Sequence, residues 1–169
     1  PSNPFYMDVT QYVATMVGIP YDNYDSWRSV YPLDVWTALY DKCAEGFEQG
    51  VNLLRQAHKV AKGDIRDKVL TQLYRAEAVR IHLKSSAVQA RFFEARNKYR
   101  TSESAEQREQ YKKIMREQCL KEQELIRQML PIVSADSSIA FESSNQYFYL
   151  PADLVEAYIS ICSALRRIE

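Results

Sequence analysis

The histidines and nearby carboxylates are the residues best suited to metal chemistry in this chain, and their spacing argues against it. A carboxylate-bridged dimetal centre in a helical bundle needs Glu-x-x-His pairs on two helices, together with further glutamates. The chain has two histidines, His58 and His82, and neither follows a glutamate at that spacing. Glu77 precedes His82 by five positions, which places the two side chains on different faces of a helix. We therefore predict no metal site and no cofactor.

Nucleophilic catalysis has no local signature either. The sequence contains no Gly-x-Ser-x-Gly motif, no Walker phosphate loop and no Gly-x-Gly-x-x-Gly motif. The closely spaced carboxylates, Glu103 with Glu106 and Glu122 with Glu124, lie in a stretch dense with Lys and Arg. On a helix such carboxylates pair with cations three or four positions away at the solvent face. We predict no catalytic residue in this chain.

Three charged residues interrupt otherwise apolar helical patterns: Arg80, Glu94 and Glu122. A ligand site is one interpretation. Buried charges in proteins are usually paired, so the sequence favours buried ionic contacts between helices over a ligand site.

The aromatic residues give the strongest functional indication. The chain has 12 tyrosines, and many gather with both tryptophans in two segments without helical spacing. One group is Tyr21, Tyr24, Trp27, Tyr31 and Trp36; the other is Phe141, Tyr147, Phe148 and Tyr149, with Glu142 and Asn145. Rings beside Asn, Asp and Glu suit sugar stacking and equally suit a polar domain interface. We favour an interface, and its candidate contacts are Trp27, Tyr31, Trp36, Glu142, Asn145, Tyr147 and Tyr149.

Composition narrows the classes of function. With 46% hydrophobic residues the chain can bury a core, which argues against intrinsic disorder. Its net charge of +0 does not favour nucleic acid or a polybasic membrane surface, and no apolar run is long enough to span a membrane. The three cysteines, Cys43, Cys119 and Cys162, are far apart and lie among apolar neighbours. We predict that they are buried free thiols.

Helices must position these residues. Proline and glycine mark their ends, and apolar residues recur every three or four positions between them. Gly63 is expected to be the C-cap of one helix and Asp64 the N-cap of the next, while Gly46 and Gly50 either weaken their helix or allow a neighbouring helix to approach closely. The expected helices are Asp8 to Met16, Pro32 to about Lys62, Ile65 to about Tyr99, Ser102 or Ser104 to about Val133, and Pro151 onward, with loops at 18–31 and 136–150.

These elements predict an all-α fold: an antiparallel bundle of three long helices plus short N- and C-terminal helices, because long helices joined by short turns pack antiparallel. We expect a single domain over residues 1–169. Its parts are a short helix and aromatic loop (1–31), the long-helix bundle (32–133), and an aromatic loop with a closing helix (134–169). The chain opens Pro1-Ser2-Asn3-Pro4 without an initiator Met, so we expect a fragment of a larger protein.

The segment Asp136-Ser-Ser-Ile-Ala-Phe-Glu-Ser-Ser-Asn-Gln-Tyr-Phe-Tyr149 resembles the D-S-R-I-G-[FW]-E-A-S-N-H-Y stretch of large glycoside-hydrolase-like proteins of gut Bacteroidetes. In those proteins a helical region follows a catalytic barrel. A Pro-x-[DE]-Leu-[VI]-Glu helix start also follows the stretch, matched here at 151–156. This sequence departs from the pattern at Ser138, Ala140 and Gln146, which stand in place of Arg, Gly and His.

The resemblance implies a non-catalytic accessory module of a larger carbohydrate-active protein, in the periplasm or at the cell surface. The expected partner is a neighbouring domain of the same polypeptide. Carbohydrate is a second candidate partner. Catalytic carboxylates would then lie on the barrel, outside this chain. An alternative of a different class is a free-standing helical scaffold that dimerises or binds a partner helix. A third is a sugar-binding module that uses Glu142, Asn145, Tyr147 and Tyr149.

Overall fold

The computed structural model describes residues 5–9, 22–139 and 149–169. This part of the chain is all-α and contains no strand, which confirms the predicted fold class. Its helices are α1 (Tyr24–Trp27), α2 (Leu33–Val60), α3 (Gly63–Thr101), α4 (Ala105–Ala135) and α5 (Pro151–Ile168).

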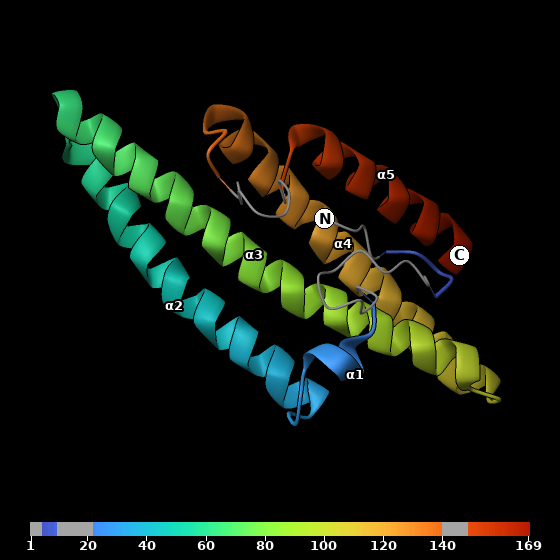
Figure 1. Ribbon diagram of the computed structural model, residues 1–169. Coiled ribbons are helices and arrows are strands. Elements are labelled where there is room, and N and C mark those ends of the chain that lie inside the picture. The colour runs from blue at the N-terminus through green and yellow to red at the C-terminus, as the bar shows by residue number, and fades with distance from the viewer. Residues whose placement is uncertain (1–4, 10–21, 140–148) are drawn as a thin grey trace.

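The helices form an open row rather than a closed ring. The long helices α2, α3 and α4 run antiparallel; α3 packs on both α2 and α4, and α5 packs on α4. In Figure 1, α2 and α5 therefore lie on opposite sides of the α3–α4 pair. With 39 residues, α3 extends for about 60 Å and lies between α2 and α4. A helix at the edge of such a row is covered on one side only.

Local sequence signals set most helix ends. Pro32 precedes α2, and Pro151 is the first residue of α5, where its fixed φ and missing N–H cost nothing. The Oγ of Ser104 caps α4 by accepting from Gln107 N–H at 3.3 Å. The predicted boundary at Gly63 is displaced: Ala61 caps α2, Lys62 precedes α3 and Gly63 begins it. Gly63 still allows the turn, because its φ of +54° is costly for other residues.

The predicted loop at 18–31 contains a short helix within its described part. α1 forms there because the Asn23 side chain accepts from Ser26 N–H at 3.3 Å. The predicted helix from Asp8 to Met16 and the predicted loop at 136–150 lie mostly outside the described residues.

The core lies along α3 and α4. α3 buries residues on two faces, since it packs between α2 and α4. The apolar stripe expected from residues spaced three or four apart includes Ile65, Leu73, Ala87 and Ala90; the last three are buried, whereas Ile65 is 65% exposed. The largest fully buried side chains on α3 belong to residues outside that stripe: Ile81, Phe92, Phe93 and Arg96.

Candidate functional site

The most unusual surface of the chain is the side of α2 turned away from α3. The buried residues of α2 are Thr37, Ala44 and Val51, which recur every seven residues. Positions two residues further on lie on nearly the opposite side of a helix with 3.6 residues per turn. Most of the residues there are apolar or small, and the exposed Lys42 is a charged residue on the same side. The apolar and small residues form what we call the outer stripe: Val35, Leu39, Cys43, Gly46, Gly50 and Leu53.

The outer stripe is exposed over most of its length. Leu39 is 47% exposed, and Leu53 is 65% exposed. A Cβ atom built on Gly46 or Gly50 would have no heavy atom within 4 Å, apart from the helix's own backbone. These glycines were predicted either to weaken the helix or to admit a neighbouring helix, and no described element lies against them. An apolar helix face of this kind ordinarily faces a partner or a core.

Cys43 lies in the outer stripe and is exposed, which corrects the prediction that all three thiols are buried. Cys119 is buried as predicted, and burial raises the pKa of its thiol to about 12. Cys162 is half-buried on α5, where it accepts from Gln123 Nε2 at 3.3 Å. The error for Cys43 arises because the apolar residues four positions before and after it, Leu39 and Phe47, are themselves exposed.

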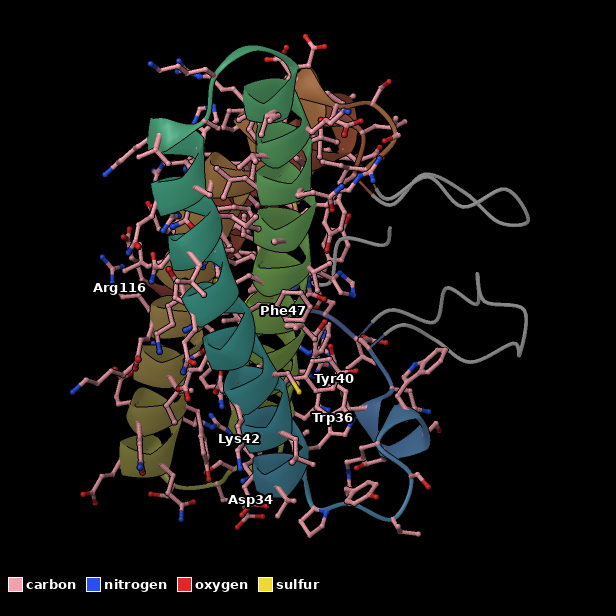
Figure 2. All side chains as sticks on the ribbon, turned by 90° about the vertical axis from the view of Figure 1, so that its left-hand side faces the viewer. Asp34, Trp36, Tyr40, Lys42, Phe47 and Arg116 are labelled. Atoms are coloured by element: carbon pink, nitrogen blue, oxygen red, sulfur yellow. The ribbon has the colours of Figure 1, made fainter. Side chains whose placement is uncertain are left out.

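The first predicted aromatic group is largely structural. Tyr24 packs on Phe93 at 5.0 Å between ring centroids and on Trp36 at 5.8 Å, and Trp36 packs on Tyr40 at 4.3 Å. These rings connect α1, α2 and α3, and burial raises the pKa of the Tyr24 hydroxyl. Figure 2 shows Trp36, Tyr40 and Phe47 on one side of α2. Trp36 is therefore half-buried in a contact between helices.

The other two candidates of this group are more accessible. Trp27 is 42% exposed and Tyr31 is 50% exposed. Trp27 is the last residue of α1, and Tyr31 lies in the turn before α2, where Arg28 donates to the carbonyl of Tyr31 at 2.5 Å. Of the predicted contact residues that the structure describes, these two are the most exposed.

The second predicted group is described only at Tyr149. Its hydroxyl lies 2.6 Å from His82 Nδ1, and the two rings meet edge to face at 5.8 Å. Glu142, Asn145 and Tyr147 lie outside the described residues. The two groups contact α3 at different places, His82 and Phe93, which are eleven residues or about 16 Å apart along the helix. The described members of the two groups therefore do not form one site.

The three interrupting charges have different roles. Arg80 is buried and lies 3.2 Å from Glu48 of α2 and 3.1 Å from Glu77 of α3, as the prediction of a buried ionic contact requires. Its guanidinium also donates to Gln128 of α4 at 2.7 Å. Glu94 instead pairs with Lys98 on the surface at 2.8 Å, so the prediction is wrong there.

Glu122 is buried as predicted, but its contacts are hydrogen bonds with neutral groups. It accepts from Ser85 Oγ at 2.6 Å and from Gln89 Nε2 at 3.3 Å, both on α3. Its second carboxyl oxygen is buried without a hydrogen-bond partner. Burial raises the pKa of this carboxyl. The predicted ionic contact is therefore replaced by a hydrogen-bonded contact between α3 and α4.

Arg96 is a buried charge that the sequence analysis missed. Its guanidinium is fully buried on α3 and pairs with Asp22 at 3.0 Å. It also donates to the backbone carbonyls of Tyr6 at 3.1 Å and Asp8 at 3.2 Å. Arg96 thereby anchors the N-terminal segment, whose Phe5 packs in the core. In the sequence, the aromatic pair Phe92 and Phe93 shortly before Arg96 is the local feature that indicates a buried position.

Neither metal binding nor a membrane span has support in the described part of the chain. Residues 5–9, 22–139 and 149–169 contain no group of three His, Cys, Asp or Glu side chains able to hold a metal ion. His58 accepts from Arg66 at 3.3 Å, far in sequence from the His82–Tyr149 contact. Among these same residues, no helix is both long and apolar enough to cross a membrane.

Comparison with known proteins gives no relative from which a function could be transferred. No protein-family model, curated protein or solved structure matches the chain. The outer stripe of α2, with Trp27 and Tyr31 nearby in sequence, is therefore the candidate site on its geometry alone.

Proposed function

We propose that this chain is a non-catalytic accessory module of a larger carbohydrate-active protein, and that it packs on a neighbouring domain through the outer stripe of α2. The observation that carries the proposal is the exposed apolar face of a helix whose opposite face is already covered by α3. Covering Leu39 and Leu53 would stabilise the contact by removing apolar surface from water, at about 25 cal/mol per Å². The carbohydrate context rests on the resemblance of residues 136–149.

Small residues in the stripe favour a flat, close contact. Gly46 and Gly50 have no side chain, so a partner backbone can approach α2 there more closely than elsewhere. Such glycines otherwise destabilise a helix by about 1 kcal/mol each relative to alanine. A docking role accounts for their place on this face.

Cys43 provides a direct test because its exposed thiol lies within the stripe. A maleimide would be applied to the isolated chain and to the longest native polypeptide that contains it, with labelled peptides identified by mass spectrometry. We expect Cys43 to react in the isolated chain and to be protected at least tenfold in the longer polypeptide. Buried Cys119 is the internal control, since it should stay unlabelled in both. Equal labelling of Cys43 in both would overturn docking through α2.

A second candidate function, self-association through α2, is favoured by one specific observation. Leu39, Cys43, Gly46, Gly50 and Leu53 follow each other at alternating spacings of four and three, the repeat of a coiled-coil seam. Self-association predicts that Cys43 protection in the isolated chain rises with protein concentration, alongside a dimer in sedimentation. Protection that appears only in the longer polypeptide supports docking within one polypeptide instead.

The non-catalytic and carbohydrate parts of the proposal have their own test. The isolated chain should be helical by circular dichroism and inactive on glycoside substrates. Hydrolysis that is abolished by a single Glu or Asp substitution would overturn a non-catalytic role. Glycan binding that is lost in Trp27→Ala and Tyr31→Ala would instead identify a sugar-binding module.

A further inference from the structure

Two buried side-chain oxygen atoms of α4 lack hydrogen-bond donors. One is Glu122 Oε2 and the other is Gln118 Oε1. Both residues belong to α4 and are 6% and 4% exposed. They are four positions apart, so their side chains are neighbours on one face of the helix. Two adjacent buried acceptors without a donor are unfavourable unless a proton lies between them.

The groups around Glu122 offer it no positive charge. From α3 it receives the neutral donors Ser85 and Gln89, both on its other oxygen. A negative charge on Glu122 would raise the pKa values of three acids near it: Cys119 on α4, Tyr24 on α1 and Tyr149 before α5. None of these three groups can supply a positive charge.

Three cationic or basic side chains along this stretch of α3 have other partners, and one of them, Arg91, pairs with Asp41 of α2. Arg80 pairs with Glu77 and Glu48, and His82 contacts Tyr149. On α5, Cys162 faces Gln123 rather than Glu122. A carboxylate buried among neutral groups costs several kcal/mol, and the usual outcome is that the group keeps its proton.

We propose that Glu122 stays protonated in the folded chain at neutral pH and donates its Oε2 proton to Gln118 Oε1, so that the α3–α4 contact weakens as the solution becomes alkaline. One proton then satisfies both oxygen atoms. Loss of that proton leaves both acceptors without a donor and places a charge in the core. Because Ser85 and Gln89 lie between His82 and Phe93 on α3, this contact separates the two aromatic groups.

The pH dependence follows from the direction of the shift. Burial raises the pKa of Glu122 above its ordinary value of 4.5. Below pH 4.5 the carboxyl is protonated in both the folded and the unfolded chain, so its contribution to stability is fully present. As the pH rises, the unfolded chain ionises first, and the unfolding equilibrium constant increases by up to tenfold per pH unit until the folded pKa is passed.

Glu122→Gln tests the proposal, because an amide keeps the acceptor and the donor of a protonated carboxyl at every pH. Urea unfolding of both proteins would be measured from pH 5 to 9. We expect the ratio of the wild-type to the variant unfolding constant to rise with pH by up to tenfold per unit. Glu117→Gln is the matched control on the same helix, since Glu117 is exposed and paired with Lys121 at 2.7 Å. A ratio for Glu122→Gln that does not change with pH would overturn the proposal.

A second measurement distinguishes a protonated Glu122 that donates to Gln118 from an ionised Glu122 that accepts from a rotated Gln118 amide. The ¹³Cδ resonance of Glu122 would be titrated in labelled wild-type chain and in Gln118→Leu. If Gln118 accepts a hydrogen bond from protonated Glu122, the substitution of Gln118 removes that bond and disfavours the protonated form. The pKa of Glu122 then falls in the variant. If Gln118 instead donates its amide to an ionised Glu122, the pKa rises in the variant. A rise would overturn the proposal, and neither outcome depends on docking through α2.

Discussion

Helix α2 packs on α3 through different kinds of side chains from those that join α3 to α4. α3 and α4 bury large side chains against each other, and buried polar groups such as Glu122 have their hydrogen bonds within that contact. α2 faces α3 with the small residues Thr37, Ala44 and Val51 and with ion pairs such as Arg91–Asp41. The apolar residues of its outer stripe, such as Leu39 and Leu53, lie on the opposite side and are exposed.

This difference separates the parts that hold the fold from the part available for binding. Removing a side chain from the α3–α4 core leaves a cavity. Removing a side chain from the outer stripe of α2 breaks few contacts within the isolated chain. An exposed apolar face with little cost to the fold is what a docking surface requires. The comparison leads to graded predictions for the two regions.

The largest difference is expected between two phenylalanines. Phe92 of α3 is 0% exposed and Phe47 of α2 is 40% exposed. Phe92→Ala should lower the free energy of unfolding by about 3–5 kcal/mol because it creates a core cavity. Phe47→Ala should lower it by less than about 1 kcal/mol. Urea unfolding followed by circular dichroism would check both, and similar losses would contradict the assignment of α2 to the edge.

The second prediction compares two ion pairs. Arg96–Asp22 is almost fully buried, whereas Arg91–Asp41 joins α3 to α2 with each side chain about a third exposed. Arg96→Met should cost about 3 kcal/mol, because it removes a buried charge partner while retaining the apolar stem. Arg91→Met should cost at most about 1 kcal/mol, since water screens the pair.

Thermal unfolding in low and high salt provides the control for these two pairs. Added salt should reduce the effect of Arg91→Met and leave that of Arg96→Met nearly unchanged, because salt screens exposed pairs more than buried ones. A strong salt dependence at Arg96 would mean that this pair is reached by solvent.

The smallest effect is expected at the α2 glycines, and its sign is informative. Gly46→Ala and Gly50→Ala should each stabilise the isolated chain by up to about 1 kcal/mol, since the added methyl meets no neighbour and alanine favours a helix. The same substitutions should weaken protection of Cys43 in the longer polypeptide. Destabilisation of the isolated chain by either substitution would contradict an uncovered face at Gly46 and Gly50.

Much of the helical framework follows from local sequence. Pro32, Ser104 and Pro151 act at helix starts through their own backbone and side-chain properties, so their positions could be predicted within a few residues. The boundary at Gly63 was displaced by a residue or two, and α1 was missed, because four residues carry too little periodic pattern.

The candidate site was less predictable. The apolar spacing of Val35, Leu39, Cys43 and Phe47 indicated a helix correctly, but an apolar stripe alone does not show whether a neighbour covers it. The small residues Thr37, Ala44 and Val51, seven positions apart, were the signal for the opposite face, and their side chains carry little hydrophobic weight. Arg96 was missed because a charged residue in a helix ordinarily faces solvent.

The sequence by itself determined the fold class, the approximate helix ends and the absence of local catalytic motifs, since these depend on neighbouring residues in the chain. The tertiary structure alone decided which face of α2 is covered, that α3 is buried on two sides, and that Glu122 meets neutral donors while Arg80 meets carboxylates. Those outcomes depend on which helix lies next to which, and residues brought together from far along the chain set both the burial and the local charge.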